Sequence, residues 1–223
     1  PLQIGELLYV CAAGNRVIAL DANSGELRWQ FDPLIDPEHL ELLRYFTTGC
    51  RGVSYFEAPE DYQGECQQRI LTATTDARLI AIDALTGERC SQFGEQGEVD
   101  LTTSMGNDPR IFNFQTSPPG IVRGNAVVGG WVFDNQSVGE PSGVVRAFDA
   151  LSGEFAWAWD MGRPGVNTQP LRGEVYTRGT PNVWSLFSVD EELGLIYAPT
   201  GNETPDYFGG QRMESSEQYA SSI

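Results

Sequence analysis

The chain contains a single histidine, His39, and this limits the chemistry that its side chains could perform. Ser-His-Asp triads and metal sites built from several imidazoles both need histidines that this sequence does not offer, so both are nearly excluded. His39 lies in the segment DPEHLELLRYF (36–46), the one stretch that predicts a helical turn. We expect it on the surface rather than at a reaction centre.

Four cysteines are the other reactive side chains, and they lack the paired CxxC spacing of a zinc site: Cys11, Cys50, Cys66 and Cys90. Cys50 and Cys66 bracket a polar, loop-like segment. They could form a disulfide, which would imply an oxidising compartment. The alternative is that all four are buried thiols, and the spacing leaves both possibilities open.

The charge of the chain restricts its ligands. It has 31 acidic against 14 basic residues, for a net charge of −17. This field repels a phosphate backbone, so no nucleic-acid partner is expected. An anionic small molecule would need a local cation or an arginine to overcome the field. No apolar run approaches the roughly 18 residues of a membrane span, and we expect any targeting segment to lie outside this sequence.

An internal repeat organises the chain around these residues. It reads Asp-x-x-x-Gly-x-x-x-Trp in its first and third copies, whereas the second has serine in place of tryptophan. The copies are Asp21, Gly25, Trp29; Asp83, Gly87, Ser91; and Asp149, Gly153, Trp157. Successive aspartates are separated by 62 and 66 residues. A repeat of this length is typical of blades with long connecting loops.

Each copy predicts a β-hairpin. The aspartate can accept hydrogen bonds from turn amides, the glycine supplies a positive φ, and the tryptophan is expected to pack between neighbouring units. Further strands are predicted before each hairpin, at Leu7–Ala12, Arg69–Thr74, Ala126–Val132 and Leu195–Pro199.

Four strands in each repeat predict an all-β fold, a partial β-propeller over residues 1–223. We expect blades at roughly 1–50, 51–110 and 111–175 and an incomplete one at 176–223. The final Ala-Ser-Ser-Ile is similar to the opening of another hairpin strand. The loops are long for a plain propeller, which indicates that they carry function.

The repeat resembles the tryptophan-docking motif of PQQ-dependent (quinoprotein) dehydrogenases, which are eight-bladed propellers that oxidise alcohols and sugars. Four strings together resemble the membrane-bound glucose, quinate and polyol dehydrogenase branch: CRGVSY (50–55), TSPP (116–119), DNQ (134–136) and TGNETPDYFGG (200–210). Phe56 stands where some members of the branch carry histidine. The substrate is therefore open among sugars, polyols and cyclic hydroxy acids.

The resemblance implies a site for pyrroloquinoline quinone (PQQ), a flat ortho-quinone with three carboxylates. Trp184 would provide the apolar floor and Arg51 would pair with a carboxylate, while Thr75 and Ser117 would add hydrogen bonds. The alternatives are that Trp184 is core packing and that Arg51 is an ordinary surface residue.

The resemblance also implies a divalent metal, Ca²⁺ or Mg²⁺, held by oxygen ligands. Asn202, in a Thr-Gly-Asn turn, is the first candidate, and Asp134 with Asn135 is the second. Each has a structural alternative, because Gly-Asn commonly forms turns and an Asp-Asn pair is common at a loop tip.

We therefore expect part of an oxidoreductase acting on CH–OH groups, with a small-molecule substrate and with electrons passing to ubiquinone. The family's general base would lie beyond Ile223, so no catalytic residue is assigned, and Asp206 is expected to shape a loop near the substrate. The parent protein would be periplasmic and anchored to the inner membrane by a segment outside this chain. Open propeller edges could also pair with another copy.

Two other classes remain as alternatives. One is a noncatalytic propeller scaffold of the outer-membrane assembly type, which shares the repeat but needs neither the CRGVSY loop nor the Trp184 to Asn202 pair. The other is a protein that binds carbohydrate without a quinone.

Overall fold

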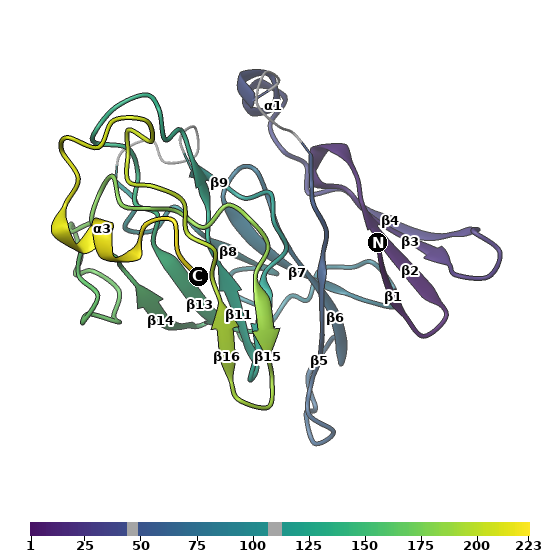
Figure 1. Ribbon diagram of the computed structural model, residues 1–223. Helices are drawn as coiled ribbons and strands as arrows, with labels where there is room; N and C mark the ends of the chain where they lie inside the picture. Colours follow the sequence, from purple (N-terminus) through teal and green to yellow (C-terminus); the bar gives the residue numbers. More distant parts are fainter. Residues whose placement is uncertain (44–48, 107–112) are drawn as a thin grey trace.

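The computed structural model describes residues 1–43, 49–106 and 113–223, and three four-stranded antiparallel sheets follow one another along this chain (Figure 1). The first sheet contains β1 (Leu2–Ile4), β2 (Leu7–Cys11), β3 (Val17–Asp21) and β4 (Leu27–Phe31). The second contains β5 (Ser54–Glu57), β6 (Gln68–Ala73), β7 (Arg78–Asp83) and β8 (Glu98–Asp100). The third contains β10 (Gly120–Val122), β11 (Asn125–Val128), β13 (Val145–Asp149) and β14 (Phe155–Trp159).

Smaller elements complete the fold. A two-stranded sheet follows the third, made of β15 (Ser188–Asp190) and β16 (Leu195–Tyr197). A short ladder joins β9 (Asn113–Phe114) to β12 (Trp131–Val132), and the helices are η1 (Ala13–Asn15), α1 (Pro37–Leu43) and α3 (Glu214–Tyr219). The predicted all-β class, with three complete units and part of a fourth, is confirmed.

One predicted strand, Ala126–Val132, is interrupted by Gly129 and Gly130, which separate β11 from β12. The interruption has a steric cause. The Gly130 N–H donates to the Val183 carbonyl oxygen over 3.0 Å, and a Cβ atom at Gly129 would clash with that same oxygen. The segment is therefore held against the chain at Val183 and does not continue its sheet.

The repeat aspartates close their hairpin turns as predicted. Oδ1 of Asp21, Asp83 and Asp149 accepts hydrogen bonds from the backbone N–H groups two and three residues later, over 2.7 to 3.0 Å. The repeat glycines have φ values of +74°, +79° and +74°, the left-handed region in which a Cβ atom is strained. The sequence pattern and the local backbone therefore agree in all three copies.

The first repeat tryptophan docks onto the next unit, as predicted. Trp29 is buried, and its Nε1 donates to the Ala84 carbonyl oxygen over 3.0 Å. A Cβ atom at Gly87 would lie only 2.7 Å from the indole, so glycine lets the ring pack on the neighbouring turn. Trp29 therefore joins the first sheet to the second through both a hydrogen bond and apolar contact.

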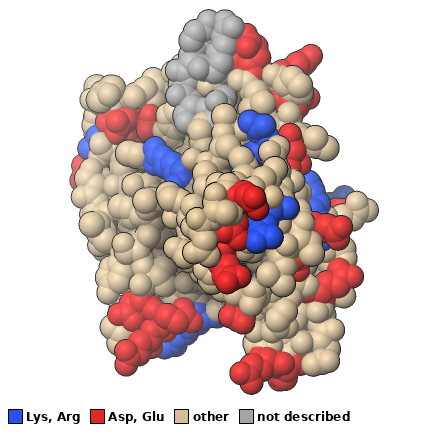
Figure 2. All heavy atoms as spheres, turned by 90° about the vertical axis from the view of Figure 1, so that its right-hand side faces the viewer, with Lys and Arg blue, Asp and Glu red and all other residues tan. Residues whose placement is uncertain are grey.

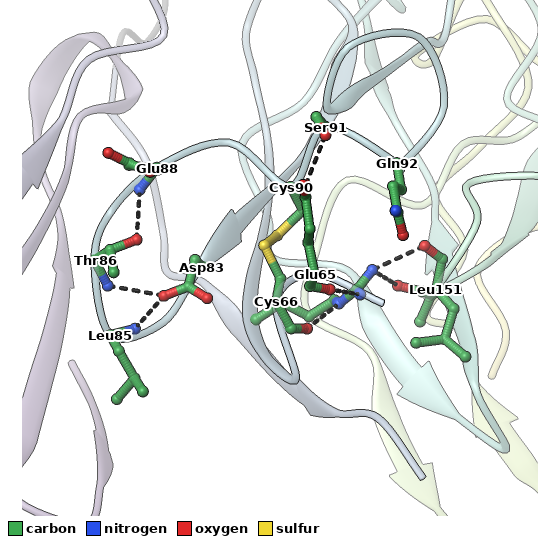
Figure 3. The surroundings of a disulfide bond; sticks show 12 residues. Glu65, Cys66, Asp83, Leu85, Thr86, Glu88, Cys90, Ser91, Gln92 and Leu151 are labelled. Atoms are coloured by element: carbon green, nitrogen blue, oxygen red, sulfur yellow. Dashed lines mark hydrogen bonds between the residues drawn. A yellow bond between two sulfur atoms is a disulfide. The ribbon is translucent and has the colours of Figure 1, made fainter. Parts of the chain in front are cut away.

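The second repeat docks differently, because Ser91 replaces its tryptophan. Arg69, on β6, is only 1% exposed, and its guanidinium donates to the Ala150 and Leu151 carbonyl oxygens over 3.1 and 2.8 Å. Ala150 follows its repeat aspartate just as Ala84 does. Figure 3 shows the Cys66–Cys90 disulfide between the Asp83 turn and Leu151.

Both cysteine predictions are wrong. All four cysteines are oxidised, but the disulfides are Cys11–Cys50 and Cys66–Cys90, not Cys50–Cys66. The register of β5 on β6 explains this, because it pairs Ser54 with Leu71 and Glu57 with Gln68. Cys50 precedes the first end of β5 and Cys66 lies beside the other end, so they are kept apart. Cys50 instead reaches the end of β2.

Two further expectations are corrected. His39 is not a surface residue: only 8% of it is exposed on α1, where its Nε2 lies 2.9 Å from the Thr75 carbonyl oxygen. The predicted helical turn itself is confirmed by α1, although the last three residues of its segment lie outside the described residues.

The final four residues do not form a strand. They follow α3, and Ser221 has a φ of +50°, which is incompatible with extended backbone. One backbone hydrogen bond connects Ser221 to Gly201, and three hydrogen bonds connect Ser222 to Thr200. In the described part of the chain, no helix has the length and apolar character needed to cross a membrane.

Candidate functional site

Three of the predicted cofactor residues meet at one carbonyl group. Nη1 of Arg51 and Oγ of Ser117 each donate a hydrogen bond of 2.9 Å to the Trp184 carbonyl oxygen. The Arg51 guanidinium carbon also lies 5.1 Å from the centre of the indole ring. The Trp184 side chain is not core, since the residue is 42% exposed. The structure thus places a partly exposed indole, a cation and a hydroxyl together.

The elements that position these residues repeat from sheet to sheet. Arg51 precedes β5, Ser117 precedes β10 and Trp184 precedes β15, so each side chain lies on the segment that enters a new sheet. The first two segments are joined by a backbone hydrogen bond of 2.8 Å from Arg51 to the Thr116 carbonyl oxygen. Because the repeat places these entry segments side by side, residues 133 positions apart can share one site.

A narrow cavity opens between these segments. Its lining includes Ser117 and Pro118 as well as Gly129, Val183 and Trp184. The interruption of the strand at Gly129 and Gly130 therefore shapes the wall of this cavity. Glycine at position 129 lets the chain approach Val183 closely, because a Cβ atom there would clash with the Val183 carbonyl oxygen.

Thr75 lies in the turn between β6 and β7 and is completely buried. Its neighbour Thr74 connects this turn to the segment that carries Ser117, because the Thr74 carbonyl oxygen accepts a hydrogen bond of 3.2 Å from the Gln115 N–H. The Thr75 hydroxyl has no hydrogen-bond partner among the described residues. A buried, unpaired hydroxyl costs free energy, so its presence points to a ligand or a water.

Asn182 belongs to the same region, and the sequence analysis missed it. It is 1% exposed, and neither atom of its side-chain amide has a hydrogen-bond partner in the described structure. Its carbonyl oxygen accepts a hydrogen bond of 2.8 Å from Gly201. A Cβ atom at Gly201 would lie 3.0 Å from Asn182 Oδ1 and 3.6 Å from Trp184 Nε1, so glycine leaves space between them.

The signal for Asn182 in the sequence was its place two residues before Trp184. That spacing alone did not reveal that the amide is buried, and burial is what makes its missing hydrogen bonds costly.

The metal candidates are not brought into one contact group. Asn202 Oδ1 accepts a hydrogen bond of 2.9 Å from Ser221, and Asn135 is exposed. Burial, followed by the nearby charge of Asp206 and then of Glu140, raises the pKa of Asp134. Within the described residues, no group of three or more His, Cys, Asp or Glu side chains could hold a metal ion.

Asp206 contacts the loop of Asp134 through its backbone, and its predicted role near the substrate stays a prediction. Its backbone N–H donates to the Asp134 carbonyl oxygen over 2.8 Å. This bond joins the loop after Asn202 to the loop that contains the DNQ string. The two metal candidates are thus carried by loops that are tied together.

Arg51 carries a positive charge in a chain whose net charge is strongly negative. The chain contains many more carboxylates than cations, and Figure 2 shows groups of acidic side chains on the face turned to the viewer. All 14 basic residues are arginines, which stay charged at any ordinary pH. Arg51 is exposed and makes no ion pair with any described residue. Its charge is therefore available to an anionic ligand.

Comparison with known proteins defines the class. The sequence model of the PQQ family described as "Glucose/ethanol/alcohol dehydrogenase, beta-propeller domain" matches residues 1–223. The chain belongs to this family. The match does not favour the scaffold alternative.

Relatives and a solved structure agree with this assignment. The chain is 40% identical to the glycerol dehydrogenase large subunit of Gluconobacter oxydans and 40% identical to the quinoprotein glucose dehydrogenase of Escherichia coli. It is 32% identical to the quinate/shikimate dehydrogenase (quinone) of Acinetobacter baylyi. Each match covers 100% of this chain but only 30%, 28% and 29% of the relative, respectively.

The quinohemoprotein alcohol dehydrogenase ADHIIG of Pseudomonas putida superposes with a TM-score of 0.64 at 26% identity. That match covers 92% of this chain and 28% of the solved chain. The present chain thus spans less than a third of the length of these proteins.

The side chains fit the cofactor that gives the family its name. A flat tricarboxylate needs an exposed aromatic face, an unpaired cation and buried polar groups without partners. Trp184 supplies the face and Arg51 the cation, and Asn182 and Thr75 supply polar atoms that lack partners. Because acidic residues outnumber basic ones 31 to 14, an anionic ligand depends on an arginine without an ion pair, such as Arg51.

Proposed function

We propose that this chain is part of a PQQ-dependent dehydrogenase that oxidises a sugar, a polyol or a cyclic hydroxy acid. The observation that carries the proposal is the convergence of Arg51, Ser117 and Trp184 at one carbonyl group beside an exposed indole. The family assignment and the names of the relatives support it.

In this proposal, each residue has a separate task. Trp184 stacks against the flat ring system, where an indole gives the largest apolar area that one side chain can offer. Arg51 binds a carboxylate through its planar fork of donors, and Ser117 and Thr75 supply hydrogen bonds. When bound, the quinone supplies the capacity to accept two electrons, which the side chains of this chain lack.

A divalent metal, Ca²⁺ or Mg²⁺, is the second proposed cofactor. Asn202 and Asp134 would donate oxygen ligands, with Asn135 beside them. The cost of holding Asp134 ionised near Asp206 and Glu140 would be offset by a cation at this position. Asn202 would have to exchange its hydrogen bond from Ser221 for the metal.

The remaining expectations concern the parent protein. Two disulfides support a periplasmic location, since disulfides persist in oxidising compartments. We propose an inner-membrane anchor outside this chain and ubiquinone as the electron acceptor. The division into blades at 1–50, 51–110, 111–175 and 176–223 and pairing with another copy through an open edge also remain proposals.

The test is dye-linked dehydrogenase activity of the parent-length protein with glucose, glycerol and quinate as substrates. Each substrate is assayed with and without PQQ, and with and without Ca²⁺ or Mg²⁺. We expect activity only when quinone and metal are both present. A folded protein that stays silent on every substrate, while related alcohols also fail, would contradict the proposal and favour a noncatalytic propeller.

A further inference from the structure

Thr75 is held by two side chains from the preceding unit. Its N–H donates to Asn15 Oδ1 over 3.0 Å, and its carbonyl oxygen lies 2.9 Å from His39 Nε2. A carbonyl oxygen can only accept, so the His39 ring nitrogen is the donor. Both backbone polar groups of one residue are therefore bound by side chains 60 and 36 positions away.

This arrangement leaves one functional group of Thr75 unused. Asn15, Thr75 and His39 are 0%, 0% and 8% exposed, so water does not reach them freely. Even so, the Thr75 hydroxyl and Asn15 Nδ2 have no partner among the described residues. The backbone N–H and carbonyl group of Thr75 are both bound, whereas its buried hydroxyl is left unpaired, and an unpaired buried hydroxyl costs free energy.

The backbone at Asn15 is also special. It has a φ of +56°, a left-handed conformation that few residues other than glycine adopt easily. Asparagine tolerates this conformation and at the same time provides the acceptor for Thr75. The position therefore combines a backbone requirement with a side-chain requirement.

We propose that Asn15 and His39 are positioning residues that orient the Thr75 hydroxyl toward the bound cofactor. The inference rests on the proposed function and adds to it residues of the first unit. A single histidine cannot form a multi-histidine metal site, and no triad is expected. In this proposal the His39 ring nitrogen is instead a fixed hydrogen-bond donor to the Thr75 carbonyl oxygen. The Thr74 carbonyl, bound to Gln115, ties the same turn to the segment that carries Ser117.

A merely structural role is the competing explanation, because the same contacts join the first unit to the second. A double-mutant cycle separates the two roles. The variants are Thr75→Val, which removes the hydroxyl and keeps the shape, His39→Phe, which removes the donor, and the pair together. The quantity measured is the dissociation constant of PQQ for the apo form of the parent-length protein. Quenching of tryptophan fluorescence reports binding, and the variants are compared at equal folded fraction.

We expect Thr75→Val and His39→Phe each to weaken PQQ binding by about tenfold, the loss expected for one hydrogen bond. The double variant should bind no more weakly than Thr75→Val alone, since His39 acts through that hydroxyl. His39→Gln, which restores an N–H donor, should recover most of the affinity. Losses that multiply in the double variant, or an unchanged affinity in either single variant, would overturn the inference.

Asn15→Gly provides a second route if His39→Phe does not fold. Glycine keeps the left-handed backbone and removes the side-chain amide that accepts from Thr75, so the same cycle can be run with Thr75→Val. Wild-type protein that binds no PQQ would refute the proposed function and this inference together. Wild-type protein that binds PQQ without coupling between the sites would refute this inference alone.

Discussion

Arg69 on β6 donates a hydrogen bond of 3.1 Å to the carbonyl oxygen of Ala150 in the turn of the third sheet. Trp29 makes the corresponding bond to Ala84 one unit earlier. The two donors reach the same kind of acceptor from different strands, so the joint between sheets is retained although the repeat has lost its tryptophan. Other donors of Arg69 bind the carbonyl oxygens of Glu65 and Cys66, which hold the guanidinium without any carboxylate.

Replacing Arg69 with Leu should therefore destabilise the joint between the second and third sheets. The variant leaves one buried and three partly buried carbonyl groups without this donor, and we expect a loss of about 3 kcal/mol in the free energy of unfolding. Urea unfolding of the parent-length protein measures this loss. Arg28→Leu is the matched control, because its side chain is 53% exposed, and its effect should be clearly smaller. Equal effects would mean that Arg69 is not a docking residue.

The disulfide pairing can be checked directly. Peptide mapping without reduction should recover Cys11 linked to Cys50 and Cys66 linked to Cys90, which are separated by 39 and 24 residues. Loops of this size predict a loss of about 3 to 4 kcal/mol when either bond is removed. Serine replacement of Cys66 and Cys90 together should show this loss in denaturant unfolding. Recovery of a Cys50–Cys66 peptide would contradict the structure.

Trp184→Ala should weaken PQQ binding far more than Trp157→Ala does. Trp184 presents an exposed indole beside Arg51, whereas Trp157 is partly buried against the core of the third sheet. Stacking on an aromatic face is worth about 1 kcal/mol beyond burial, so a loss of at least tenfold is expected once the buried area is included. Fluorescence titration at equal folded fraction provides the comparison. The same loss in both variants would make Trp184 a packing residue.

Asn202→Ala should raise the concentration of Ca²⁺ or Mg²⁺ needed for half-maximal activity of the parent enzyme. One lost oxygen ligand from a site of this kind predicts a shift of about tenfold or more. Ser221→Ala is the informative control, since it removes only the donor that occupies Asn202 Oδ1 and should not raise the requirement. An unchanged metal requirement in Asn202→Ala would exclude this residue from the metal site.

The turn at Asp21 should give stability a dependence on pH. The Arg28 guanidinium, followed by the backbone N–H groups of Ser24 and Asn23, lowers the pKa of Asp21 from its usual value of 3.8. A lowered pKa stabilises the folded state above pH 3.8, and this contribution is lost as the pH falls through the folded-state pKa. Asp21→Asn should therefore destabilise the protein at pH 7, with a difference that shrinks in acid.

Thermal unfolding from pH 7 to pH 2.5 follows this difference. Arg28→Ala, which removes the largest cause of the shift, should abolish most of the pH dependence that Asp21 contributes. A difference between wild type and Asp21→Asn that stays constant down to the lowest pH would contradict the assignment.

The sequence by itself determined the repeating unit. Asp, Gly and Trp at fixed spacing specify a hairpin turn through local hydrogen bonds and a positive φ, and local interactions can be read from neighbouring residues. For the same reason, the three sheets and the helical turn at α1 were predictable. The short strings around Arg51, Trp184 and Asn202 named the candidate cofactor residues only through their resemblance to the quinoprotein family, and these roles stay predictions.

Only the tertiary structure decided which distant residues meet. The disulfide partners depend on the register of β5 and β6, which places Cys50 and Cys66 at opposite ends of a strand. Asn182 stands out because its amide is buried without a hydrogen-bond partner among the described residues. His39 stands out because its buried ring is hydrogen-bonded to a residue of the next unit. Burial is a property of packed neighbours and not of sequence position, so no pattern within one segment could show it.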